Sequence, residues 1–134
     1  MKRKIAIFIL GALLMTNLNM FAFAADNNTQ IISPCWVNIG RISGHLTVNG
    51  DTGNISIAIS GNNDVTKITA TATLYYKNSK GSWVKMKDWK YSVNSDVLAI
   101  NETFDASAAS SYKVILTADV YADGYTESVT KEFT

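Results

Sequence analysis

The chain has little of three residue types that often carry chemistry or covalent stability. Its 134 residues include one cysteine (Cys35), one histidine (His45) and one proline (Pro34). A single cysteine cannot form a disulfide within the chain, so a folded domain must be held together by its core. One histidine and one cysteine are too few for a zinc site, and no G-x-S-x-G motif supplies a nucleophile for His45. We therefore expect no enzyme: no catalytic residues, no bound metal and no cofactor.

Two acidic motifs look like sites but are better explained as turns. The run from Gly50 to Gly53 contains the D-T-G of aspartic proteases, which needs a second copy that the chain lacks. Calcium prefers six to eight oxygen ligands. The loop residues that offer such oxygens are Asn62, Asn63, Asp64, Asp51 and Asp123. Without a dense D-x-D-x-D run, turn chemistry explains them better, and weak calcium binding stays an alternative.

Positive charge is also scarce outside the N-terminus. Three of the 12 Lys/Arg fall in residues 2–4. The rest of the chain contains nine Lys/Arg and 11 Asp/Glu, which gives it a net charge of −2. Nucleic-acid binding needs clustered Lys and Arg, so we expect no nucleic-acid partner. The nearest cluster is Lys85, Lys87 and Lys90, which we interpret as lysines that keep an edge strand soluble.

What the chain does have is an N-terminal export signal. Basic residues 2–4 precede the apolar run 5–14, and Ala22-Phe23-Ala24 matches an A-x-A cleavage site. We expect residues 1–24 to be a signal peptide, 25–35 a disordered lead-in and 36–134 one β-sandwich domain. The protein would then be secreted, with no membrane attachment after cleavage. Cys35 lies too far beyond the site for lipidation, which leaves burial beside Trp36 or an intermolecular disulfide.

The domain is dominated by residues that alternate between apolar and polar, the pattern of strands with one buried face. Turn-forming residues separate seven such segments, at about 36–48, 54–60, 66–77, 82–91, 96–104, 111–122 and 125–133. Residues 105–110 have room for one helical turn. The predicted core comprises Ile55, Ile57, Ile59, Leu74, Val84, Leu98, Ile100, Tyr112, Val114, Leu116 and Val120. Seven short antiparallel strands predict an all-β, two-sheet sandwich.

The C-terminal part shows a family resemblance. Residues 111–120 (SYKVILTADV), Gly124 and 130–134 (TKEFT) resemble the last hairpin of fibronectin type III and related immunoglobulin-like domains. Tyr112 matches a tyrosine whose hydroxyl returns to the backbone of the preceding corner. Residues 40–134 are also similar to a group of small exported proteins of clostridia and related Firmicutes, which have no assigned activity. The resemblance implies a seven-stranded immunoglobulin/fibronectin III-like sandwich and secretion, and it adds no mechanism.

The aromatic residues predict one unusual surface. If Leu74 and Val114 face inward, alternation turns Tyr75, Ile115 and Tyr121 outward. With Val84 and Met86 inward, Trp83, Lys85 and Lys87 share that outer face. A fibronectin-like strand order makes these strands neighbours. We therefore expect a single patch on this face, consisting of Tyr75, Trp83, Ile115 and Tyr121.

Two functions fit these observations. The favoured hypothesis is an extracellular binding or adhesion module whose partner, a protein or a surface glycan, docks on the aromatic face or the loops. The alternative is a structural protein that associates with itself through an edge strand or Cys35. Cross-strand aromatic pairs that only stabilise the sheet would explain the patch without any ligand.

The cleavage site gives the first testable prediction. N-terminal sequencing of secreted protein is expected to begin at Ala25 or Asp26, because signal peptidase requires small residues at the positions of Ala22 and Ala24. A full-length product retained in the membrane would contradict the signal-peptide interpretation.

Overall fold

The structure is a computed structural model, and it describes residues 36–134. The predicted signal peptide, the lead-in and Cys35 lie outside the described residues. Within 36–134 the chain forms seven strands and no helix. They are β1 (Ile39–Asn49), β2 (Thr52–Gly61), β3 (Val65–Lys77), β4 (Trp83–Val93), β5 (Val97–Asp105), β6 (Tyr112–Ala122) and β7 (Tyr125–Phe133). The predicted number of strands and the all-β class are confirmed. Residues 105–110 contain a turn at 107–108 and no helix, so the helical turn for which they have room does not form.

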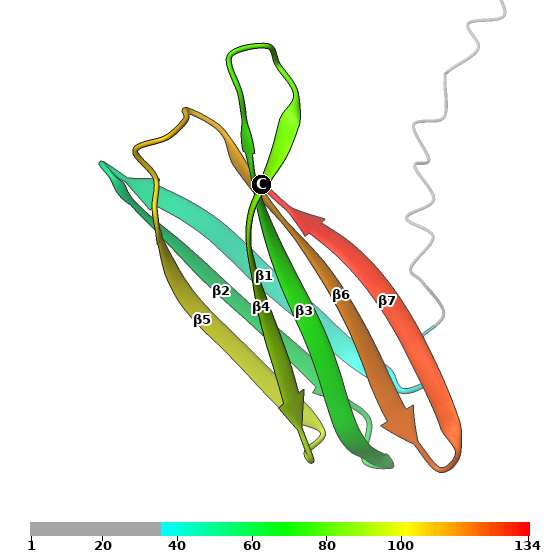
Figure 1. The fold of residues 1–134 in the computed structure, drawn as a ribbon. Coiled ribbons are helices and arrows are strands. Elements are labelled where there is room, and N and C mark those ends of the chain that lie inside the picture. The colour runs from blue at the N-terminus through cyan, green and yellow to red at the C-terminus, as the bar shows by residue number, and fades with distance from the viewer. Residues whose placement is uncertain (1–35) are drawn as a thin grey trace, which may run out of the picture. The chain divides into compact units, whose positions relative to one another are not determined.

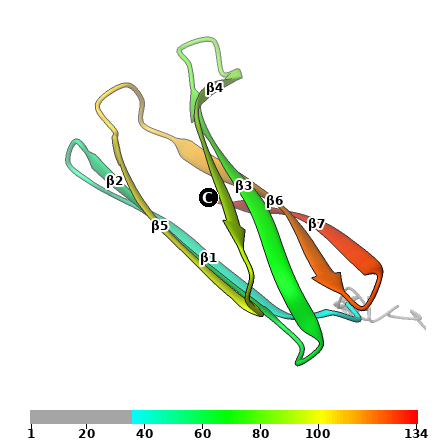
Figure 2. The same cartoon turned by 60° about the horizontal axis from the view of Figure 1, so that its bottom comes forward.

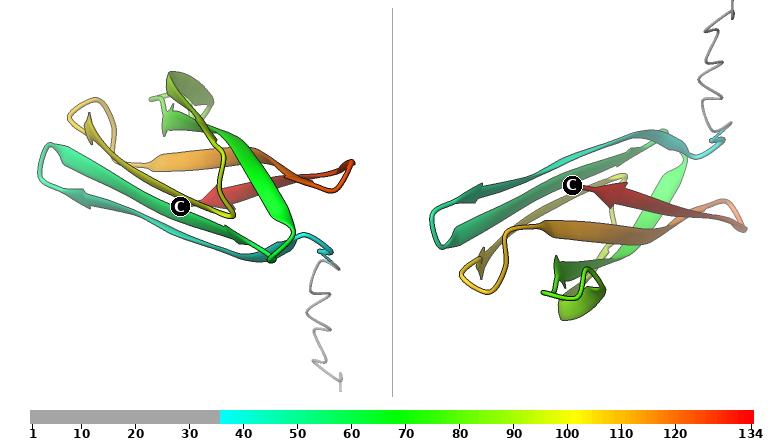
Figure 3. Two further views of the ribbon diagram at one scale, coloured as in Figure 1. Left: turned by 90° about the horizontal axis from the view of Figure 1, so that it is seen from below. Right: turned by 90° about the horizontal axis from the view of Figure 1, so that it is seen from above.

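The strands are arranged in two antiparallel sheets that pack face to face (Figure 1). One sheet has the order β1-β2-β5 and the other the order β4-β3-β6-β7. A tilted view and two end-on views show the two sheets as separate layers (Figures 2 and 3). The strands that carry Trp83, Tyr75 and Ile115 (β4, β3 and β6) are neighbours in one sheet, so their predicted adjacency is confirmed.

Alternation along the strands creates the core. In β6 every second residue from Tyr112 to Ala122 is buried, and the residues between them point outward. β2 and β3 alternate in the same way. All of the predicted core residues are buried except Val84, which is half-buried on edge strand β4. The residues with the largest fully buried side chains are Ile57, Ile59, Ile68, Leu74, Ile100, Leu116, Val114 and Val120.

A β-bulge in β4 changes which side chains face outward. Tyr75 pairs with Lys85 and Leu74 with Lys87, so Met86 is an extra residue between them. A bulge of this kind reverses the phase of the alternation beyond it. Met86 is 38% exposed instead of inward, and Lys87 pairs with inward-facing Leu74 instead of joining the outer face. The predicted orientations of Met86 and Lys87 are therefore wrong.

Local interactions close the end of the sandwich around Tyr112. The Ala109 N–H donates a hydrogen bond of 2.9 Å to the Tyr112 hydroxyl, so the predicted return to the preceding corner is confirmed. The Tyr112 ring packs against Phe104, with centroids 5.1 Å apart. Phe104 also lies over Gly53, where a Cβ atom would come within 2.1 Å of the ring. Only glycine fits beneath that ring.

Charged side chains on β7 seal one open side of the sandwich. The Glu127 carboxylate accepts hydrogen bonds from the backbone N–H groups of Val37 (3.1 Å), Asn38 (2.8 Å) and Ile39 (3.0 Å). The Lys131 ammonium donates to the carbonyl of Ile42 at 3.1 Å. These charges satisfy polar backbone groups on edge strand β1 and on the two residues before it. Inward-pointing charges of this kind oppose pairing with another chain.

A second polar contact connects the sheets on the opposite side. The Tyr91 hydroxyl of β4 donates a hydrogen bond to Glu102 of β5. Burial of the hydroxyl, followed by the bond to Glu102 and the charge of its carboxylate, raises the pKa of Tyr91 to about 12. The two edge strands on this side therefore also meet through a polar side-chain pair.

The core predicts a large cost for truncating Leu116. The Leu116→Ala variant is expected to lose about 2–5 kcal/mol of unfolding free energy, since its side chain is fully buried. Urea titration measures the loss. Ile115→Ala on the outward face of the same strand is the matched control, with an expected loss of about 1 kcal/mol or less. Equal losses in the two variants would contradict the assigned faces of β6.

The Tyr91–Glu102 contact predicts a pH dependence. Above the ordinary tyrosine pKa of 10.0 the unfolded chain loses the phenolic proton, whereas the folded chain keeps it up to about 12. The contribution of this group to stability is therefore complete below pH 10.0 and is lost as the pH rises to about 12. The difference in ultraviolet titration between wild type and Tyr91→Phe isolates the titration of Tyr91. The Glu102→Gln variant is expected to lower the pKa of Tyr91, because it removes the charge of the carboxylate. A Tyr91 that titrates at its ordinary value in the folded domain would contradict the assignment.

Candidate functional site

The candidate site lies on the outer face of the β4-β3-β6-β7 sheet. Trp83 of β4 pairs with Lys77 of β3. Two residues before Lys77 on β3, Tyr75 pairs with Lys113 of β6. Thr73, the next outward residue of β3, pairs with Ile115. The structure thus brings Trp83, Tyr75 and Ile115 into neighbouring rows at one end of the face.

Tyr121 does not belong to this group. It pairs with Lys67 near the beginning of β3, six residues from Ile115 along β6, or about 20 Å at the usual rise per residue of a strand. It lies about 30 Å from the row of Trp83 by the same measure. The prediction of one patch containing all four residues is therefore wrong, although Tyr121 does lie on the same strand face. Alternation fixes the face of a residue but not its distance along a long strand.

Two lysine side chains surround the Trp83 indole. The Lys113 ammonium lies 4.8 Å from the centroid of the Trp83 ring and 6.0 Å from that of Tyr75. The Lys77 ammonium lies 5.8 Å from the Trp83 centroid. Cations at such distances are attracted to the electron-rich face of an aromatic ring. We call Trp83, Tyr75, Lys113 and Ile115, together with Glu132, the Trp83 cluster.

An ion pair holds Lys113 in place. Its ammonium lies 2.8 Å from the Glu132 carboxylate on β7, and its side chain is only 15% exposed. Trp83 is 39% exposed, whereas Tyr75 and Ile115 are half-buried. Trp83 is thus a partly exposed indole in contact with a cation that is itself paired with a carboxylate.

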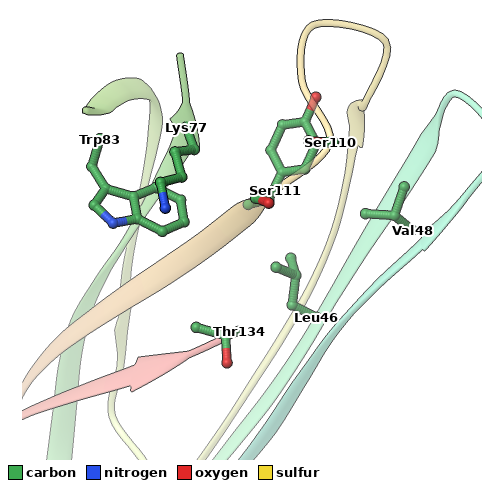
Figure 4. A pocket seen from close by; sticks show the side chains of 8 residues that line it. Leu46, Val48, Lys77, Trp83, Ser110, Ser111 and Thr134 are labelled. Carbon is green, nitrogen blue, oxygen red and sulfur yellow. The ribbon is translucent and has the colours of Figure 1, made fainter. Parts of the chain in front are cut away.

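A shallow hollow of ≈ 390 Å³ adjoins Trp83 at this end of the sandwich. Figure 4 shows that it lies between β1 and the β3–β4 hairpin. Leu46 and Val48 of β1 form its apolar side. Polar groups are contributed mainly by Lys77, Ser110 and Ser111. The hollow can therefore accept a ligand with both apolar and hydrogen-bonding groups.

Three other residues that the sequence analysis considered as candidate ligands or catalytic groups make contacts typical of strands and turns. His45 is exposed on β1 and pairs across the sheet with Ser56. The Asn62 side-chain amide donates to the carbonyl of Val37, and the Asp51 carbonyl accepts the N–H of Ala106 at 2.8 Å. Across residues 36–134, no three His, Cys, Asp or Glu side chains group as metal ligands. The same part of the chain has no helix suited to crossing a membrane.

Sequence reasoning missed three parts of the site. Lys77 and Lys113 are outward neighbours of Trp83 and Tyr75, and the correct register alone would have revealed them. Glu132 could be found only from the pairing of β6 with β7. The hollow has no sequence signal, because its lining residues come mainly from β1, the β3–β4 hairpin and the segment before β6, which only the fold brings together.

Comparisons with known proteins add little. No protein-family model matches the sequence, and no curated protein matches it. Among solved structures, the chain is similar to the crystal structure of Spo0M, a sporulation control protein from Bacillus subtilis, with 9% sequence identity and a TM-score of 0.38. The match covers 73% of this chain and 49% of that one, so the chain spans about half the length of Spo0M. A likeness this distant carries no argument about activity or partners.

Proposed function

We propose that the protein is a secreted single-domain binding or adhesion module whose contact surface is the Trp83 cluster. The observation that carries the proposal is the indole of Trp83, which stays 39% exposed on a rigid sheet while Lys113 and Glu132 orient it. Exposed, pre-oriented aromatic rings are typical anchors of binding surfaces, because little conformational freedom is lost on contact. The partner is a protein or a surface glycan, and the function involves no catalytic step.

We further propose that the domain is an immunoglobulin-like sandwich of the fibronectin type III kind. The sheet orders β1-β2-β5 and β4-β3-β6-β7 support this assignment, and so does the hydrogen bond from the Ala109 N–H to the Tyr112 hydroxyl. Such sandwiches expose the outer faces of their sheets and the loops at their ends. In this domain the Trp83 cluster lies on a sheet face, and the hollow lies at one end of the sandwich.

Self-association is the alternative function, and the edges bear on it. Glu127 and Lys131 turn inward on β7 and satisfy backbone groups of Ile39 and Ile42 on β1, while β4 carries a bulge at Met86. Both features oppose edge-to-edge pairing. They support the binding module over an assembly built through strand edges. Association through Cys35 is tested by measuring the mass in solution with and without reductant.

The binding proposal predicts the effect of removing the two rings. The double variant Trp83→Ala, Tyr75→Ala is expected to lose binding to whichever glycan or surface protein the wild type retains on an array. Its unfolding free energy is expected to fall by only about 1–2 kcal/mol, because both side chains lie on the solvent face.

Tyr125→Ala is the matched control, since Tyr125 is 57% exposed at the beginning of β7, where it pairs with Ala122, far from Trp83. It is expected to change neither binding nor stability. If the double variant instead loses folding in parallel with binding, the rings only stabilise the sheet and the proposal fails.

A further inference from the structure

Positive charge is concentrated in the hairpin that carries Trp83. Residues 77–90 contain five lysines and one aspartate, a formal charge of +4. The rest of residues 36–134 contains four Lys/Arg and nine Asp/Glu, a formal charge of −5. The hairpin extends beyond the neighbouring strands at its end of the domain (Figures 1 and 2). Lys77 and Lys80 lie at the tip, and Lys85, Lys87 and Lys90 continue along edge strand β4. The domain therefore presents a basic tip and edge on an acidic body, which favours contact with an anionic partner on this side.

Protection of a sheet edge does not account for all of these lysines. Lys85, Lys87 and Lys90 lie on edge strand β4, where lysines discourage pairing with another chain. Lys77 lies on β3, an interior strand, and its ammonium lines the hollow beside Trp83. Within residues 36–134, Lys85 pairs with Asp88 and Lys113 with Glu132, whereas Lys77 forms no ion pair. Lys77 thus offers an uncompensated charge next to the exposed indole.

The groups around Lys77 fit a sugar that carries negative charge. The C–H groups of a pyranose ring have a slightly positive surface that stacks on the negative face of an aromatic ring. Ser110 and Ser111 are exposed at the hollow and offer hydroxyls for hydrogen bonds. A carboxylate or sulfate on the same sugar would reach an ammonium group and form a charge-assisted hydrogen bond.

Two other anionic partners fit less well. The tip between β3 and β4 is polar, and the Asn78 side chain holds it by accepting the N–H groups of Lys80 (3.0 Å) and Ser82 (2.9 Å). A tip without apolar residues has nothing to insert into a membrane interface. Single-stranded nucleic acid binds by stacking successive bases on several aromatic rings. In the Trp83 cluster Trp83 is exposed and Tyr75 is half-buried, so the cluster offers one ring for stacking instead of several.

We propose that the β3–β4 hairpin and the adjoining hollow bind an acidic polysaccharide, with a sugar ring on Trp83 and its anionic group on Lys77. The proposal rests on the function proposed above and narrows its ligand class. Lys113 acts in it as a positioning residue, since its charge is already paired with Glu132 and its contact with Trp83 fixes the indole.

Calorimetric titration of the exported protein with an oligogalacturonate tests the proposal, and the methyl ester of the same oligosaccharide is the uncharged control. The acidic form is expected to bind and the ester to bind at least about tenfold more weakly, because esterification removes the charge-assisted bond. Raising the salt from about 0.05 M to about 0.5 M is expected to weaken binding, since the contact is exposed to screening.

Matched variants locate the site. Lys77→Gln and Trp83→Ala are each expected to weaken binding about tenfold, and Trp83→Phe is expected to retain most of it. Lys67→Gln is the control for Lys77→Gln, because Lys67 lies on the same strand with its ammonium 5.5 Å from the centroid of Tyr121. It is expected to change affinity by less than about twofold. Thermal melting of each variant checks that the fold persists.

Several results would overturn the proposal. Equal binding of the acidic oligosaccharide and its ester would show that the protein does not recognise the negative charge. Equal binding of polyphosphate or single-stranded DNA, unaffected by Trp83→Ala, would show unspecific attraction to polyanions. Trp83-dependent binding of anionic vesicles would assign the hairpin to a membrane surface. If only a neutral glycan or a protein binds through Trp83, the acidic-polysaccharide proposal fails and the proposed function stands; if no ligand depends on Trp83, both fail.

Discussion

The two-residue period of a strand is the constraint on which the rest of this structure depends. Without a disulfide in the described domain, stability rests on burying every second residue between two sheets. Once Val114 and Leu116 of β6 face the core, Lys113 and Ile115 must face outward. The outer face is therefore not independent of the core. The Trp83 cluster forms where outward positions of β4, β3 and β6 fall in neighbouring rows.

The same constraint explains the treatment of the edges. A sandwich has open sides where inward positions on the outermost strands meet water. On β7 two such positions are Glu127 and Lys131, whose charged ends satisfy backbone groups of Ile39 and Ile42 on β1. On the other side, Tyr91 and Glu102 form a polar contact between the sheets. Charged residues at inward positions are thus part of the closure of the core.

The fold was predictable to the extent that alternation and turns are local signals. Strand number followed from these signals, and every predicted core residue is buried except Val84, which lies on an edge strand. The core also contains residues that the prediction left out, among them Ile39, Ile42 and Phe104. The adjacency of the strands came from the fibronectin-like order that the resemblance implied. The outer face was less predictable. The bulge at Met86 arises from pairing with β3 and has no signature in β4 alone, so Lys87 was assigned to the wrong face. Tyr121 was placed on the correct face but at the wrong end, because its partner Lys67 is set by the register of two long strands.

The proposal of a binding surface depends on the position of the lysines. Lysines that only prevent aggregation are needed where backbone groups are unpaired, on β4 and β7. Lys77 and Lys113 are on β3 and β6, whose backbones are paired on both sides. Both nevertheless direct their ammonium groups to the ring of Trp83, and the charge of Lys113 is compensated by Glu132 while that of Lys77 is not. One lysine therefore fixes the indole, and the other supplies charge beside the hollow. Neither role follows from keeping the sheet in solution, and together they favour a surface arranged for an anionic ligand.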